Sequence, residues 1–169
     1  MRAGGWVCNN VSDIFLFAKA PMPTSTRFAV AVHTLAALAV SGGRPLRSED
    51  LANSVNTGPV VVRSLLSRLS DAGLTTSQLG AGGGALLAKR ADRIRLLDIY
   101  KAVEDTEMFS MPRTPPNAAC PVGGNIHDAM RPALERARKA LEAELSRVTL
   151  ADIAAEVARL GKFAVPEGW

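Results

Sequence analysis

The sequence predicts a mainly α-helical fold with a small β-hairpin, and three observations support this prediction. Aromatic residues make up 5% of the chain and hydrophobic residues 47%, which indicates an aliphatic core of the kind that helices form. Residues 51–71 contain two short apolar-periodic segments separated by a turn. A strand, a glycine-rich tip and a second strand then follow within residues 74–88. This order is the outline of a winged helix-turn-helix domain.

The first helix is expected over residues 26–41, and a run of glycine ends it at Gly42-Gly43. Its apolar residues follow the spacing of one helical face. They are Phe28, Ala31, Val32, Leu35, Leu38 and Ala39.

The second and third helices flank a tight turn at residues 56–58. Ser48 is expected to cap the second helix, with Glu49 and Asp50 in its positive first turn. Pro59 occupies the first position of the third helix, where its missing N–H costs nothing. The third helix should bury one apolar stripe, made of Val62, Leu65, Leu66 and Leu69.

The other side of the third helix is polar and basic, which suits a helix that lies in the major groove of DNA. A solvated surface has the same pattern, but the preceding turn and the following hairpin favour a recognition helix over residues 57–72 with a wing over 74–88. The candidate DNA-binding residues are Ser48, Thr57, Pro59, Val60, Arg63, Ser64, Ser67, Gly80, Gly82, Gly83 and Gly84.

The glycine-rich tip at residues 80–84 is interpreted as a wing tip whose bare backbone approaches DNA phosphates. A nucleotide-binding loop would need a helix directly after the glycines, and an apolar strand-like run follows instead. Charge agrees with the DNA interpretation. Nine basic and five acidic residues lie within 24–100, against nine and ten beyond residue 100.

The second half of the chain predicts a helix over 93–105, a proline-rich loop over 106–123 and a long helix over 125–148. Pro132 is expected to kink the long helix or mark its effective start. Thr149 should cap a last helix in a capping box with Asp152. Apolar residues along the long helix form a near-heptad seam, which predicts a homodimer interface. This seam contains Ile126, Met130, Leu134, Ala137, Leu141 and Leu145.

The predicted organisation follows from these elements. Residues 1–23 are expected to be a disordered tail or an over-long start, with Met22 as an alternative initiator. Residues 24–105 form the winged helix-turn-helix domain, 106–123 the linker or sensor loop, 124–160 the dimerisation helices and 161–169 a tail. No apolar run approaches a bilayer span, and two cysteines make no disulfide framework, so a cytoplasmic protein without membrane contact is expected.

Several segments together resemble the Rrf-two family of bacterial winged-helix regulators, over about residues 24–155. They are RFAVAVHTLAALA, SEDLANSVNTGPVVVRSLLSRLSDAGL, TSQLGAGGGALLAK, RLLDIYKAVE, CPVGGNI and TLADI. The resemblance implies a dimeric transcription regulator, usually a repressor, that binds a palindromic operator in double-stranded DNA. It also implies that the third helix contacts the major groove and the wing the minor groove.

The chain departs from cluster-binding members of that family. Those members carry three cysteines in the loop before the long helix, and this chain has only Cys120 there. Because a [2Fe–2S] cluster needs four protein ligands, no metal and no cofactor are predicted. Leu79 also stands where those members often have a basic wing residue, which predicts weaker wing contacts.

Cys120 has two interpretations, a small buried hydrophobe or a reactive thiol that acts as a redox sensor. A small-molecule or redox effector is compatible with this loop, but no pattern identifies one. An enzyme is not predicted, because the sequence contains no nucleophile–base constellation and no phosphate loop. The alternative function is a dimeric protein-interaction module whose winged helix does not bind DNA.

Overall fold

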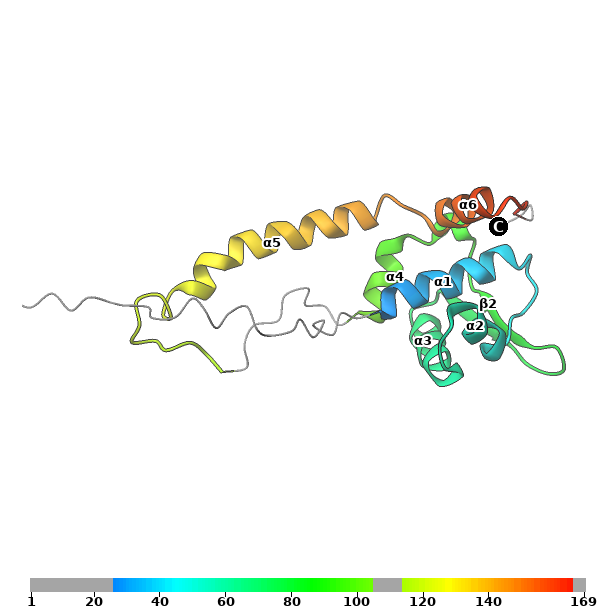
Figure 1. Ribbon diagram of the computed structural model, residues 1–169, viewed down its shortest axis with the longest axis horizontal. Helices are drawn as coiled ribbons and strands as arrows, with labels where there is room; N and C mark the ends of the chain where they lie inside the picture. The colour runs from blue at the N-terminus through cyan, green and yellow to red at the C-terminus, as the bar shows by residue number, and fades with distance from the viewer. Residues whose placement is uncertain (1–25, 105–113, 166–169) are drawn as a thin grey trace, which may run out of the picture.

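The computed structural model describes residues 26–104 and 114–165, and within them the chain forms a helical head and a projecting helix (Figure 1). The elements are α1 (Arg27–Val40), α2 (Ser48–Val55), α3 (Pro59–Asp71), β1 (Thr75–Gln78), β2 (Gly84–Leu87), the short 3-10 helix η2 (Ala91–Arg93), α4 (Leu96–Val103), α5 (Ile126–Leu145) and α6 (Leu150–Gly161). We call α5 the arm, and the remaining elements the head. The predicted tail over residues 1–23, with Cys8 and Met22, lies outside the described residues.

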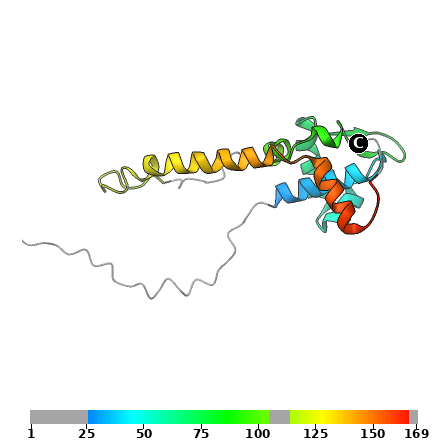
Figure 2. The ribbon, with the colours of Figure 1, turned by 90° about the horizontal axis from the view of Figure 1, so that it is seen from above.

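The core of the head is built around α1, whose fully buried residues include Ala31, Leu35 and Leu38. The buried face of α1 is wider than predicted, because it also includes Ala36, and α6 packs against α1 (Figure 2). Ile99 of α4 and Leu150 of α6 complete the same aliphatic core. The head therefore draws its core from both ends of the described chain.

The N-terminus of α1 is satisfied by a residue 76 positions away. The Glu104 carboxylate accepts the backbone N–H of Phe28 at 3.1 Å and pairs with Arg27 at 3.4 Å. A carboxylate at this position satisfies a backbone donor that the helix leaves unpaired, and it complements the helix dipole. Next to it, the rings of Phe28 and Tyr100 meet edge to face with centroids 5.8 Å apart. These contacts fix the end of α4 against the start of α1.

The hairpin is a two-stranded antiparallel sheet in which Thr75 faces Leu87 and Gln78 faces Gly84. Leu46, in the segment before α2, pairs with Ala85 through two backbone hydrogen bonds of 2.8 and 3.0 Å. This pairing connects β2, close to the tip of the hairpin, directly to the segment that leads into α2.

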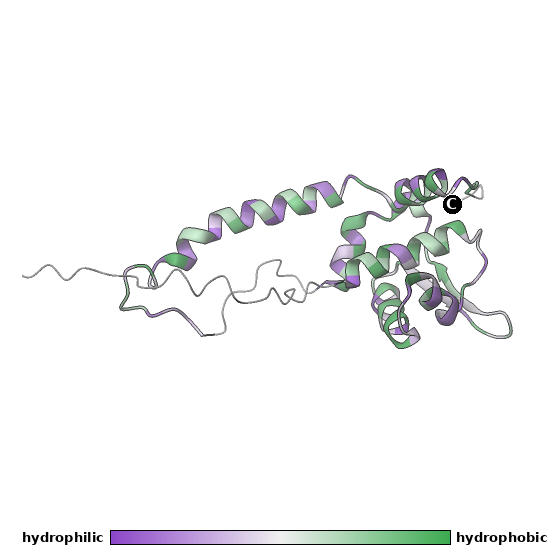
Figure 3. Ribbon diagram, in the orientation of Figure 1, coloured by the Kyte–Doolittle hydropathy of each residue, from purple (hydrophilic) through white to green (hydrophobic). Residues whose placement is uncertain are grey.

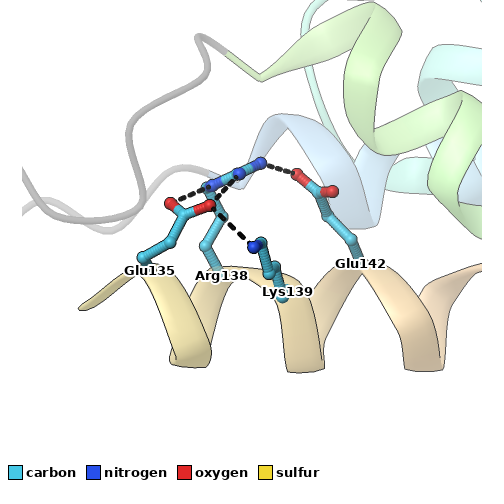
Figure 4. Close-up of polar contacts among 4 residues, drawn as sticks. All are labelled: Glu135, Arg138, Lys139 and Glu142. Carbon is cyan, nitrogen blue, oxygen red and sulfur yellow. Dashed lines mark hydrogen bonds and ion pairs between the residues drawn. The ribbon is translucent and has the colours of Figure 1, made fainter. Parts of the chain in front are cut away.

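The arm leaves the head as a single helix of 20 residues, none of which is buried (Figure 1). Hydrophobic and hydrophilic residues alternate along its ribbon (Figure 3). Its C-terminal end is joined to the head where Leu96 donates its N–H to Val148 at 3.0 Å and Leu150 donates its N–H to Ile94 at 2.8 Å. On the side towards α4, Arg138 pairs with Glu135 and with Glu142, and Lys139 also pairs with Glu135 (Figure 4). Pairs at this spacing support an exposed helix.

Several predicted boundaries are corrected by the structure. The helix expected over 93–105 begins at Leu96, because Ile94 and Arg95 instead pair with the segment that leads into α6. The long helix ends at Leu145, three residues earlier than expected. Pro132 is not its start, since α5 begins at Ile126 and continues through the proline. The capping box between Thr149 and Asp152 is confirmed.

Candidate DNA-binding interface

The turn between α2 and α3 is as tight as the sequence predicts. Asn56 adopts a left-handed conformation (φ 57°, ψ 52°), and the N–H of Thr57 is donated to the Ala52 carbonyl at 3.0 Å. Asparagine tolerates this conformation better than most residues. Gly58 then precedes α3 with Pro59 at the first helical position. Thr57 and Pro59 are both half-buried at the base of α3.

The two sides of α3 differ as predicted. Val62, Leu65 and Leu69 are buried against α1 and α4, and Leu66 is half-buried. The opposite side carries the exposed candidates Val60, Arg63, Ser64 and Ser67, and the Val60 side chain is 72% exposed. An exposed polar and basic helix face of this kind can enter a major groove.

Ser48 does not cap α2, which corrects the sequence prediction. Arg47 occupies the cap position, and no side chain caps this end. The Ser48 hydroxyl accepts the Nε–H of Arg63 at 3.1 Å and donates to Glu49 at 3.2 Å. The Ser48 hydroxyl thus binds a side chain of α3, 15 residues away, and a neighbouring side chain of α2, and it does not cap the backbone of its own helix.

Arg63 extends from α3 to the start of α2, where its Nη2 lies 2.5 Å from a Glu49 oxygen. This hydrogen bond lowers the pKa of Glu49 below its ordinary value, so the carboxyl stays ionised to a lower pH than an unpaired glutamate. The sequence pattern places Glu49 in the first turn of α2 and predicts no contact with Arg63. The sequence shows an acidic residue in one helix and an arginine in the next, but their spacing does not indicate that the two side chains pair.

A shallow groove of about 450 Å³ separates α3 from the hairpin. Six hydroxyl-bearing residues line it, together with the acidic Asp71 and the apolar Leu66 and Ala85: Ser48, Ser67, Ser70, Thr75, Thr76 and Ser77. Arg63 and Gln78 also line it. Hydroxyls, amides and guanidinium groups are the groups that bind phosphate oxygens and base edges. The groove therefore joins the predicted recognition helix to the predicted wing in one polar surface.

The tip glycines divide into two pairs. Gly80 (φ 96°) and Gly82 (φ 80°) have the backbone conformation that favours glycine, and nothing lies within 4 Å of a Cβ added to either. A Cβ on Gly83 would lie 2.3 Å from the Gln78 carbonyl oxygen, and one on Gly84 2.4 Å from that of Leu46. The first pair leaves open space for an approaching phosphate, whereas the second permits close packing within the hairpin. Leu79, beside them, is 91% exposed.

Cys120 lies in a turn ahead of α5, and its side chain is exposed. The interpretation of Cys120 as a buried hydrophobe is therefore wrong. Hydrogen bonds from the backbone N–H groups of Gly123 and then Val122 lower the pKa of the thiol below its ordinary value. The loop prediction over 106–123 is only partly described, because residues 105–113 lie outside the described residues.

The apolar residues predicted as a dimer seam have two environments. Towards the free end of the arm, Ile126 and Leu134 are half-buried, and Met130 is 41% exposed. Ala137 is exposed. Leu141 faces Tyr100 and Lys101 of the head, and Leu145 packs against the core. Within the described chain, the outer half of the seam thus lacks a covering element.

Comparison with known proteins identifies the family. Residues 24–156 match the Rrf2 family, described as an iron-dependent transcriptional regulator. The chain belongs to this family. The "Putative HTH-type transcriptional regulator YwnA" of Bacillus subtilis is 39% identical over 129 residues, which is 76% of this chain and 95% of that protein.

Solved structures agree with the assignment. A structure described as "a putative DNA binding protein" is 38% identical, with a TM-score of 0.60 over 75% of this chain and 97% of that one. The oxidized form of Staphylococcus aureus CymR is 26% identical, with a TM-score of 0.59 over 79% of this chain and 96% of CymR.

The protein is therefore a DNA-binding transcriptional regulator of the Rrf2 family, and both the predicted winged-helix fold class and the family resemblance are confirmed. Since this family consists of regulators and not of enzymes, the prediction that the chain is not an enzyme is also confirmed. Within residues 26–104 and 114–165, no helix has the combined length and hydropathy needed to cross a bilayer.

The family is described as iron-dependent, which raises the question of whether residues of this chain could bind iron. Among the described residues, no three His, Cys, Asp or Glu side chains gather closely enough to bind a metal ion. Cys120 is one of two cysteines in the sequence, and Cys8 lies outside the described residues. A [2Fe–2S] cluster needs four ligands, mostly thiolates. The described residues do not fit such a cluster.

Proposed function

We propose that this Rrf2 regulator acts in the cytoplasm as a homodimer that binds a palindromic operator and represses transcription. The observation that carries the proposal is the exposed surface formed by α3, the groove and the hairpin, which presents Arg63 and several hydroxyl groups. In this surface the exposed side of α3 is free of contacts with the core, and the hairpin lies beside it. That arrangement suits a helix in the major groove and a wing on the neighbouring backbone.

The candidate residues take different roles in this proposal. Arg63 donates to a base edge, for which guanine offers two acceptors. Ser64 and Ser67 lie beside Arg63 on the exposed side and donate to bases or phosphates, while Val60 contacts a thymine methyl group. Ser48, Thr57 and Pro59 lie at the edge of this surface. Gly80 and Gly82 bring bare backbone close to a phosphate, while Gly83 and Gly84 shape the hairpin.

Two copies pair through the arm. An isolated helix with an apolar row gains stability by burying that row, and the head covers only its C-terminal end. Ile126, Met130, Leu134 and Ala137 are therefore assigned to the partner arm. A two-fold dimer presents two α3 helices, and such dimers bind half-sites one helical turn apart.

Cys120 supplies the regulatory input. Its exposed thiol lies at the start of the arm, and its lowered pKa increases the thiolate fraction that reacts with oxidants or electrophiles. The relative CymR of Staphylococcus aureus has been solved in an oxidized form, which is compatible with redox chemistry in this family.

Selection of bound sequences from random double-stranded oligonucleotides tests the proposal. We expect an inverted repeat with half-sites about 10 base pairs apart, bound by two chains, as measured by light scattering of the complex. Binding should weaken steeply with added salt, because counterions are released from the DNA backbone. A protein that selects no sequence, and whose weak binding has no salt dependence, would instead be a protein-interaction module.

A further inference from the structure

Arg63 is the one candidate base-contacting cation on the described exposed side of α3, and it has two partners at the start of α2. Its Nε donates to the Ser48 hydroxyl at 3.1 Å, and its Nη2 donates to Glu49 at 2.5 Å. Ser48 in turn donates to Glu49 at 3.2 Å. The three side chains form a closed set in which each contacts the other two.

These partners use only one edge of the guanidinium group. A guanidinium has five N–H donors in a rigid planar fork. Ser48 takes the Nε–H, and Glu49 takes a hydrogen of Nη2, while Nη1 makes no hydrogen bond within the described chain. The terminal edge, formed by Nη1 and the second Nη2 hydrogen, stays available. Two parallel N–H groups of this kind match O6 and N7 of guanine.

We propose that Glu49 is a specificity-determining residue that positions Arg63 to contact a guanine and weakens the binding of Arg63 to DNA phosphates. The proposal rests on the proposed function, since it requires Arg63 to face DNA. Glu49 acts on DNA only through Arg63, and is a positioning residue.

Three physical arguments support a role in recognition and not in folding. The side chains of Arg63 and Glu49 are 57% and 53% exposed, and exposed ion pairs contribute little to folding stability. A side chain that is ordered before binding loses less conformational entropy when DNA arrives. The nearby carboxylate also reduces the attraction of Arg63 for phosphates, which carry no sequence information. Correct bases are thereby favoured over non-specific DNA.

The neighbouring acid provides a matched control. Asp50 belongs to the same first turn of α2, is exposed, and makes no hydrogen bond or ion pair in the described part of the chain. Glu49→Ala and Asp50→Ala therefore remove the same charge from the same turn, and only the first removes a partner of Arg63. Alanine is a good helix former, so both variants should keep the head folded.

The experiment repeats the oligonucleotide selection with the full chain, Glu49→Ala, Asp50→Ala, Arg63→Ala and the double variant Glu49→Ala/Arg63→Ala. Affinities for the selected operator and for a scrambled duplex are then measured. We expect Glu49→Ala to flatten the preference at the same base pair as Arg63→Ala, and to lower the operator-to-scrambled affinity ratio about fivefold to tenfold. Asp50→Ala should raise both affinities together and leave every base preference unchanged. In the Arg63→Ala background, Glu49→Ala should not change the preference at that base pair.

Three results would overturn the inference. If Glu49→Ala and Asp50→Ala give the same selected sequence and the same affinity ratio, Glu49 contributes only charge. If Arg63→Ala alters no base preference while the full chain selects an operator, Arg63 contacts no base, and the regulator proposal still stands. If the full chain selects no sequence at all, the proposed function and the inference fail together.

Discussion

In the head, Leu35 and Ile99 are completely buried against neighbours from the same chain, whereas no residue of the arm is buried. Both regions consist of amphipathic helices, so the difference lies in what covers them. α1 is covered by α4 and α6, while the outer half of α5 extends beyond the head (Figure 1). A helix with an uncovered apolar row depends on a partner for part of its stability. The comparison therefore separates residues that fold the chain from residues that assemble it.

The largest expected effect is the loss of a core leucine of the head. Leu35→Ala should lower the free energy of unfolding by about 2–5 kcal/mol, because it leaves a cavity in the aliphatic core. Leu134→Ala in the arm is the matched control, and at concentrations where single chains dominate it should cost below about 1 kcal/mol. Urea denaturation followed by circular dichroism measures both. Equal losses would contradict the distinction between head and arm.

Charge in the uncovered row should break the assembly and leave the head folded. Met130→Glu places a carboxylate among residues assigned to the partner arm, and light scattering should then show single chains. Operator affinity should fall on the order of a hundredfold, because two linked half-site contacts become separate events. Ala143→Glu, at an exposed position on the other side of α5, is the control. Paired chains in the Met130→Glu variant would exclude this row as the interface.

Removal of the capping box at Thr149, between the arm and α6, should have a smaller effect on stability. Thr149 accepts the Asp152 N–H at 3.0 Å, and Asp152 accepts the Thr149 N–H at 2.8 Å, so Thr149→Ala should cost about 1 kcal/mol. The hydrogen bonds from Thr149 lower the pKa of Asp152 below its ordinary value of 3.8. The stabilisation is therefore complete above that value and is lost as the pH falls through the lower, folded-state pKa. Thermal melts between pH 2 and 7 should show a shallower acid loss for Thr149→Ala; identical pH slopes would contradict this.

The smallest expected effect on operator affinity, under reducing conditions, is that of Cys120→Ser. Cys120→Ser should leave operator affinity within about twofold under reducing conditions, because the thiol is exposed and away from the core. After treatment with peroxide, diamide or a quinone, the parent protein should change its affinity and the variant should not. Gel-shift titrations before and after treatment measure the difference. Equal responses in the two proteins would exclude Cys120 as the sensor.

Local patterns predicted much of this molecule. The turn at Asn56, the proline start of α3, the stripe of Val62, Leu65 and Leu69 and the capping box at Thr149 all depend on residues close in sequence. Periodicity and cap chemistry report such neighbours well. These elements also defined which side of α3 is exposed.

Contacts between distant segments could not be predicted in the same way. Ser48 is a residue type that often caps helices and lies at the start of α2, but its hydroxyl contacts Arg63 across the turn. Leu145 fits the heptad seam, yet it packs against the head because the chain turns back there into α6. Glu104 satisfies the start of α1 from 76 residues away. In each case a tertiary neighbour replaced the local partner that the pattern suggests.

The close backbone contacts of Gly83 and Gly84, on the return side of the hairpin tip, limit which wing residues can be varied. With carbonyl oxygens at 2.3 and 2.4 Å from any added Cβ, a library that randomises residues 79–84 should converge on glycine at 83 and 84, and the positive φ angles at 80 and 82 should also favour glycine. Leu79 and Ala81 are exposed and should accept many side chains, lysine and arginine among them. New DNA preferences can therefore be engineered at Leu79 and Ala81 without changing the backbone path of the hairpin.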